Sequence, residues 1–316
     1  TAFALLSAFA LVFLSACSSP AQTSHAPDGS RLLVVASVFP LYDFARSVGG
    51  DYVVAEQLLP PGVNPHAYDP KPSDIKLLSD ADIFVLTSRH LEASVWKIVS
   101  SVKNDNPSLS VLEAADSAVR LRMIAGSDEH SDSDEHSDDF PFDPHIWTDF
   151  SNDIAIVDAL AKEFSEKDPE HASYYHERAS AYKKQLLELD AQYRNSLSNC
   201  RLKTFVIGGH AAFSYLASRY NLTQIAVEGL SPNAKPSPKV METVINVMRD
   251  KGIRYVFFDK FASPQVAEVL ADEAGATPLV LDAAANRNKD QLEADVSFIQ
   301  IMQSNLENLK KALECD

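Results

Sequence analysis

The chain has 316 residues, of which 46% are hydrophobic and 23% are charged. These are ordinary values for a globular protein, and the length is sufficient for two lobes with their own cores. The formal net charge of −16 argues against nucleic-acid binding, because a negative surface is repelled by phosphate backbones. Seven of the acidic residues lie between Ser127 and Asp139, with no Lys or Arg among them, so part of the charge is concentrated in one segment.

The chain begins with an apolar run, residues 2–14, that leads into Leu14-Ser15-Ala16-Cys17. At a rise of about 1.5 Å per residue, this run is too short to cross a hydrocarbon core of about 30 Å. It resembles a bacterial lipoprotein signal, so we predict a signal peptide over 1–16 and acylation of Cys17 after cleavage. A plain secretory signal followed by a chance cysteine is the alternative. No Met or basic residue precedes the run, and we expect a few further residues before it.

Residues 17–30 are polar and rich in Ser and Pro. This composition predicts a flexible tether. A lipid on Cys17 together with this tether would hold the folded part of the chain near a membrane surface. We therefore expect a lipid-anchored protein of the bacterial cell envelope, outside the cytoplasm.

Residues 31–168 are predicted to form an N-terminal α/β lobe. Short β-branched runs alternate with amphipathic stretches, which favours a mainly parallel sheet flanked by helices. The predicted strands are 32–36, 53–59 and 83–87, and the predicted helices are 42–48 and 73–81.

One segment of this lobe, the loop 126–140, is of low complexity. It contains the hexapeptide SDEHSD twice in tandem, at 127–132 and 133–138. Such residues cannot build a core, which predicts a solvated loop. A plain charged loop is one interpretation. The other is a weak cation trap, because His130 and His136 each lie beside acidic residues.

A single long helix, 169–198, is predicted to connect the two lobes. Asp168 suits the N-cap and Pro169 suits the first helical position. Apolar residues recur every three or four positions and form one stripe, namely Tyr175, Ala179, Tyr182, Leu186, Leu189 and Tyr193. Thirty residues correspond to a rod of about 45 Å, which is long enough to brace two lobes.

Residues 199–316 are predicted to form a C-terminal lobe with the same α/β alternation. The predicted strands are 205–208, 224–227, 255–258 and 279–281, separated by helices such as 237–251 and 264–274. Apart from Cys17, the cysteines are Cys200 and Cys315. A disulfide between them would suit an oxidising compartment, and two free thiols are the alternative.

Three of the nine histidines lie in contexts that favour a binding site. His66 follows a predicted strand within a Pro-rich loop, His145 lies in DPHIW, and His210 follows the Gly-Gly pair at a strand end. Asp282 ends another predicted strand. Ligands of open α/β sheets bind outside the carboxyl ends of the strands, so these four side chains are candidates for one site.

Three imidazoles and one carboxylate are a suitable ligand set for a four-coordinate zinc ion. The same donors also suit manganese, cobalt, nickel and copper to varying degrees. Scattered histidines are more often structural, so the spacing alone leaves that interpretation open.

Four segments in order along the chain resemble the signature segments of one protein family. They are PPGVNPHAYDPKPSD (60–74), DPHIW (143–147), HAAFSYLASRYNL (210–222) and GLSPNAKPSPK (229–239). Together with the lipoprotein signal, the connecting helix and the His/acid loop, they resemble the zinc- and manganese-specific solute-binding lipoproteins of ABC importers. The resemblance implies that His66, His145 and His210 are metal ligands, with Asp282 as a fourth, carboxylate ligand.

The resemblance is greatest to the zinc-type members, because the third ligand position is His rather than Glu. It implies a receptor that is not an enzyme, binds Zn²⁺ as transported cargo (Mn²⁺ being the alternative) and delivers it to an ABC permease. We further expect a monomer. One departure is Asp259, where the family usually carries Glu, so the role of that position is open.

Two functions from other classes are the alternatives to a metal receptor. A zinc hydrolase would need three protein ligands and an open position for water, but no H-E-x-x-H or similar base motif is present. A surface adhesin is compatible with the same fold and anchor, although no adhesive surface can be identified from the sequence.

Overall fold

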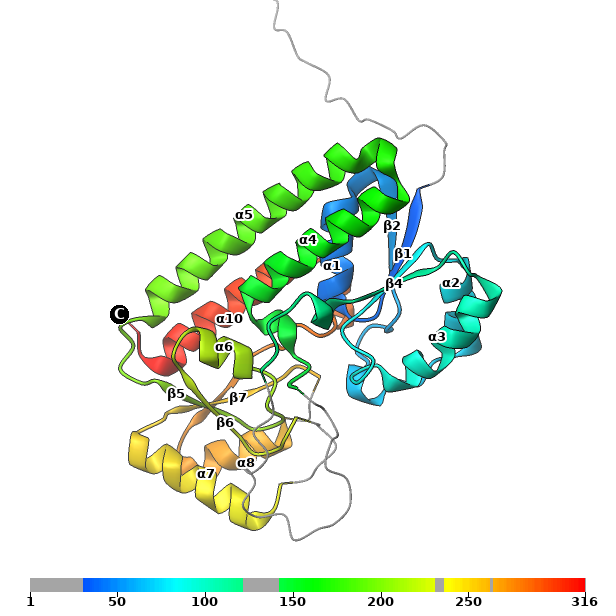
Figure 1. The fold of residues 1–316 in the computed structure, drawn as a ribbon. Coiled ribbons are helices and arrows are strands. Elements are labelled where there is room, and N and C mark those ends of the chain that lie inside the picture. Colours follow the sequence, from blue (N-terminus) through cyan, green and yellow to red (C-terminus); the bar gives the residue numbers. More distant parts are fainter. Residues whose placement is uncertain (1–30, 122–141, 231–235, 262–263, 316) are drawn as a thin grey trace, which may run out of the picture.

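Two four-stranded parallel sheets, one in each lobe, form the framework of the protein (Figure 1). The structure is a computed structural model, and it describes residues 31–121, 142–230, 236–261 and 264–315. The predicted signal peptide, tether, lipidated Cys17 and His/acid loop with His130 and His136 lie outside the described residues. The predicted fold class, two α/β lobes with parallel sheets and a long connecting helix, is confirmed.

The two sheets have the same strand order. In the N-lobe the order is β2-β1-β3-β4, and in the C-lobe it is β6-β5-β7-β8, with every pairing parallel. The strands are β1 (Leu32–Ala36), β2 (Val53–Gln57), β3 (Ile83–Leu86), β4 (Ser110–Glu113), β5 (Thr204–Ile207), β6 (Thr223–Ala226), β7 (Tyr255–Phe258) and β8 (Thr277–Val280). Seven of these were predicted within a few residues of their bounds. The exception is β4, a short edge strand whose residues are only partly buried.

Helices cover both faces of each sheet. The N-lobe contains α1 (Phe39–Gly49), α2 (Pro72–Asp80) and α3 (Ala93–Asp105), and the C-lobe contains α6 (Ser214–Arg219), α7 (Pro238–Lys251), α8 (Gln265–Ala274) and α9 (Lys289–Glu293). Alternation along β1 sends Val34 and Ala36 into one core and Val35 into the other, on the side of α2 and α3. Because β1 is buried on both faces, all of its residues are apolar.

Three long helices brace the lobes: α4 (Phe150–Lys167), α5 (Ala172–Leu197) and α10 (Phe298–Leu313). Figure 1 shows α4 and α5 running side by side from one lobe to the other. The predicted rod corresponds to α5, a helix of 26 residues preceded by a 3-10 turn at Pro169–His171. Within the described residues, none of the helices combines the length and apolar character needed to cross a bilayer.

The last helix, α10, links the lobes a second time. At its start the Phe298 amide donates a hydrogen bond to the Asp43 carboxylate in α1 (3.1 Å), and the Phe298 ring lies 5.1 Å from that of Phe44. Further along, the Tyr193 hydroxyl of α5 donates to the Met302 carbonyl. One hydrophobic cluster accordingly runs from Phe44 in the N-lobe to Phe205 in the C-lobe. A wide rotation of the lobes would expose this core to water.

A disulfide joins Cys200 to Cys315 across 115 residues of sequence. It connects the start of the C-lobe to the end of α10. Beside it, the Leu202 amide donates to the Leu313 carbonyl (3.0 Å). The covalent link therefore secures the helix that braces both lobes.

We predict that Cys200→Ser together with Cys315→Ser lowers the free energy of unfolding by about 2–5 kcal/mol, because the unfolded chain loses the restraint of a long closed loop. Urea denaturation of the oxidised protein and the variant measures the difference. Reduction of the unmodified protein serves as the control and should produce the same loss. Equal stability of all three samples would contradict the prediction.

Candidate metal centre

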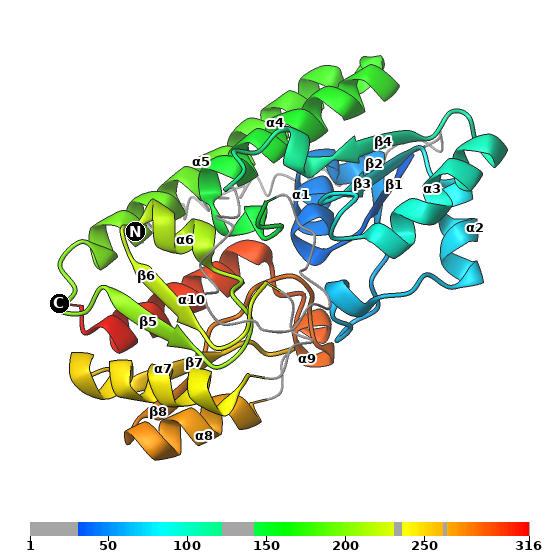
Figure 2. The same cartoon turned by 60° about the horizontal axis from the view of Figure 1, so that its bottom comes forward.

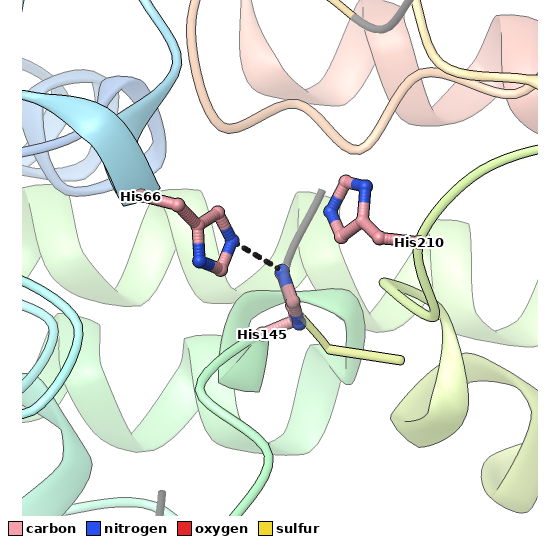
Figure 3. Close-up of side chains that lie close together, drawn as sticks. All are labelled: His66, His145 and His210. Atoms are coloured by element: carbon pink, nitrogen blue, oxygen red, sulfur yellow. Dashed lines mark hydrogen bonds between the residues drawn. The ribbon is translucent and has the colours of Figure 1, made fainter. Parts of the chain in front are cut away.

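Three imidazole rings from three separate loops meet between the lobes (Figure 3). The ring centroid of His66 lies 5.3 Å from that of His145 and 5.5 Å from that of His210. The centroids of His145 and His210 lie 5.2 Å apart. One nitrogen of each ring lies within 4.8 Å of the other two. The structure thus brings together the three histidines that the sequence placed in one candidate site.

His66 is positioned by a 3-10 turn, Pro65–Ala67, that follows β2. The turn begins at Asn64, whose side-chain oxygen accepts a hydrogen bond from the His66 amide (2.9 Å). Gly62 has a φ of 80°, a conformation that most other residues avoid. These local features turn the chain so that the His66 ring faces the other lobe.

His145 is oriented by Asp143. One carboxylate oxygen of Asp143 accepts hydrogen bonds from the His145 amide (2.9 Å) and from its ring Nδ1 (2.8 Å). A proton on Nδ1 leaves the lone pair of Nε2 free, and carboxylate–histidine pairs of this kind are usual in metal sites. The Asp143 side chain was not singled out from the sequence, although the Asp-x-His spacing in DPHIW carries the signal.

His210 follows β5 after Gly208 and Gly209. The Gly208 amide donates to the Phe257 carbonyl of β7 (2.8 Å), and a Cβ on Gly208 would lie only 2.6 Å from Cα of Ala267 in α8. A side chain at 208 would therefore push the strand end away from α8. The glycine lets the chain pass closely over this helix before it presents His210.

Burial favours the neutral form of two of these rings, His66 and His210. It lowers the pKa of His66 to about 3, with a further contribution from the neighbouring His145. Burial also lowers the pKa of His210 well below its ordinary value, again assisted by the other two histidines. A neutral imidazole is the form that binds a metal ion.

The spacing of one nitrogen pair, from His66 and His145, is close to that around a tetrahedral ion. Nε2 of His66 and Nε2 of His145 lie 3.2 Å apart (Figure 3). Two nitrogens bound to tetrahedral zinc at about 2.0–2.1 Å lie roughly 3.3–3.4 Å from each other. The cavity between the rings has a volume of about 10 Å³, which is the size of a single ion or water molecule.

The predicted carboxylate, Asp282, is not among the residues that line this cavity. One of its oxygens accepts from the Ala284 amide (2.8 Å) and the other from the Gln291 side chain (2.9 Å). Lys260 Nζ lies 3.5 Å from the second oxygen. Asp282 is therefore held by its own lobe.

Asp259 lines the cavity together with the three histidines. Its carboxylate accepts a hydrogen bond from the Ala283 amide (3.1 Å). Burial, and secondarily the charge of Asp282, raises the pKa of Asp259 to about 7. The position that departs from the family pattern is thus the carboxylate on the cavity wall.

The fold and the site together define a two-lobe binding protein whose cleft is suited to one transition-metal ion. The model of the family described as zinc-uptake complex component A, periplasmic, matches residues 34–312, and the chain belongs to this family. The chain is 32% identical over 312 residues to the zinc-binding lipoprotein AdcA of Streptococcus pneumoniae, covering 98% of this chain and 60% of that protein. It therefore spans less than two thirds of the length of this relative.

Two further relatives cover nearly the same region. The high-affinity zinc uptake system protein ZnuA of Bacillus subtilis is 31% identical over 314 residues, which is 98% of this chain and 96% of that protein. The crystal structure of the Zn(II)-bound ZnuA-like domain of S. pneumoniae AdcA has a TM-score of 0.74 and 30% identity, covering 90% of this chain and 100% of that domain. The family resemblance inferred from the sequence motifs is confirmed.

We predict that Asp143→Ala weakens binding of a transition-metal ion by about 10–100-fold, because the His145 ring loses the partner that orients it. Competition with a chromophoric chelator measures the affinity. Asp168→Ala is the matched control, since Asp168 accepts from His171 Nδ1 at 2.7 Å outside the three-histidine site. Equal losses in both variants would show that the Asp143–His145 pair has no special role.

Proposed function

We propose that this protein captures one zinc ion outside the cytoplasm and delivers it to the membrane permease of an ABC importer. The observation that carries the proposal is the convergence of three imidazoles from both lobes on a cavity of ion size. The family description and the names of the relatives support the same function. No bond chemistry is required, since the ion is cargo.

We propose zinc rather than manganese because of the donor atoms. The cluster offers three nitrogens, and manganese prefers oxygen ligands. A receptor for manganese with the same fold is the alternative.

For the fourth coordination position we propose a carboxylate. Asp282 was the expectation from the sequence, but using it would require one of its oxygens to leave a hydrogen bond to Ala284 or Gln291. Asp259 already lines the cavity. It is the stronger candidate, as a direct ligand after a small shift or through a bridging water.

We further propose that the receptor is a monomer held at the membrane by a lipid on Cys17. The tether 17–30 would let it reach the permease. The loop with His130 and His136 would raise the local metal concentration near the site. The lipoprotein name of the AdcA relative supports the anchor.

The rival function, a zinc hydrolase, is disfavoured by the size of the cavity. About 10 Å³ leaves no room for an ester or phosphate substrate beside the ion. We therefore propose that the protein is not an enzyme, and the zinc-loaded protein should leave generic ester and phosphate substrates intact.

We predict that the Cys17→Ser protein, purified without a metal-affinity tag, contains about one equivalent of zinc that manganese cannot displace. Metal analysis and competition titration measure this. His66→Ala and His210→Ala should each remove tight binding, and His176→Ala, a histidine of the exposed rod surface, should leave it unchanged. If manganese binds as tightly as zinc, the assignment of zinc as the cargo is wrong. If the protein binds no metal ion tightly, the proposed function is refuted.

We predict that Asp259→Asn weakens zinc binding by about tenfold or more, because an amide cannot supply the negative charge that a buried dication favours. Asp282→Asn should have a smaller effect, because Asp282 does not line the cavity. The same competition titration compares the two variants, which differ from the parent by one charge each. A larger loss of zinc affinity in Asp282→Asn than in Asp259→Asn would identify Asp282 as the fourth ligand.

A further inference from the structure

A loop of the C-lobe crosses to the N-lobe immediately beside the metal cavity. We call residues 282–287 the crossing loop. The Ala285 carbonyl accepts from the Phe39 amide (3.0 Å), and the Ala283 carbonyl accepts from the Trp147 indole (2.7 Å). Both alanines line the cavity. Figure 2 shows α9, which follows this loop, at the boundary between the lobes.

The side chain of Asn286 forms the centre of this contact. It is 1% exposed, and its amide nitrogen donates to the carbonyls of Pro60 and Val63, both at 2.8 Å. Its oxygen accepts from the Gln57 side chain and from the Arg287 amide, also at 2.8 Å. An asparagine side chain offers two donor hydrogens and two acceptor lone pairs, so all of its capacity is used.

The backbone that Asn286 holds is the loop that carries His66. We call residues 60–67 the His66 loop. Three hydrogen bonds join this loop to the crossing loop. Two are donated by Asn286, and the third is donated by the Gly62 amide to the Arg287 carbonyl (2.9 Å). On the N-lobe side, Val63 packs against the cluster that contains Leu58 and Leu59, and Nε2 of His66 lies 3.2 Å from Nε2 of His145. Polar bonds to the opposite lobe thus help to fix the loop that carries His66.

His66 is also the most accessible of the three ligands. His145 and His210 are 1% and 5% exposed, whereas His66 is only half-buried. The shared core and the braces α4, α5 and α10 oppose a wide rotation of the lobes. Movement of the His66 loop is the smaller change that would open the site.

We propose that Asn286 is a positioning residue for metal capture, holding the His66 loop in the ion-binding arrangement, and that separation of its amide from Pro60 and Val63 is the step that releases the ion. This inference rests on the proposed function. Asn286, which does not line the cavity, would then control how long the ion stays bound.

The test measures zinc dissociation into excess chelator by stopped flow, using the full Cys17→Ser protein. In Asn286→Asp the carboxylate cannot donate to the two carbonyls, so we expect dissociation to be faster by about 10–100-fold. Asn106→Asp is the matched control: Asn106 donates to the carbonyls of Ser79 (3.0 Å) and Ala81 (2.8 Å), all within the N-lobe. If Asn286→Asp does not fold by circular dichroism, Asn286→Ala replaces it.

A double-mutant cycle separates positioning from general destabilisation. In a His66→Ala background, Asn286→Asp should change the residual zinc affinity by less than about twofold, because its partner ligand is absent. In a His210→Ala background, Asn286→Asp should still lower the residual zinc affinity. If Asn286→Asp lowers the affinity by the same factor in both backgrounds, or if Asn106→Asp has an equal effect, the inference is overturned. Absence of zinc binding in the unmodified protein would instead refute the proposed function.

Discussion

The convergence of three imidazoles in one cleft is the constraint on which the rest of the structure depends. His66, His145 and His210 come from loops separated by about 65 to 80 residues, and only the fold brings them together. Burial lowers the pKa of His66 and of His210 and so disfavours their protonated forms. The same burial that makes the site costly to build therefore keeps the lone pairs available for a metal ion.

Each of the three histidines is carried by the carboxyl end of a sheet or by a loop beside it, and each has its own local support. Asn64 caps the turn before His66, Asp143 orients His145, and Gly208 allows the close packing that precedes His210. The sheets themselves are fixed by α4, α5 and α10, which share one core across both lobes. A rigid frame of this kind leaves adjustment of the site to the loops.

Much of this arrangement could be predicted from the sequence because its signals are local. Runs such as Leu32–Ala36 are apolar on both faces, and the stripe on α5 repeats every three or four residues. The three histidines were recognisable from their motifs and strand ends. By contrast, β4 was missed, and none of its four residues is fully buried.

What the sequence could not supply was the pairing of distant polar groups. Asp282 and Asp259 both end strands of the C-lobe, and nothing in their neighbourhoods shows which carboxylate the sheet turns towards the cavity. The Ala284 amide and Gln291 bind Asp282, which leaves Asp259 at the wall. The role of Asn286 could not be predicted from the sequence either, since its partners Pro60 and Val63 are more than 220 residues away in the chain.

Two buried carboxylates, Asp143 and Asp259, lie beside the three histidines. Burial and the charge of Asp282 raise the pKa of Asp259, so without a cation its ionised form is disfavoured. A dication between the three rings would reverse this preference, because a nearby positive charge stabilises a carboxylate. The second oxygen of Asp143 is buried without a hydrogen-bond partner among the described residues. A cation that binds only the folded protein would therefore also stabilise the fold, because binding shifts the folding equilibrium towards the bound state.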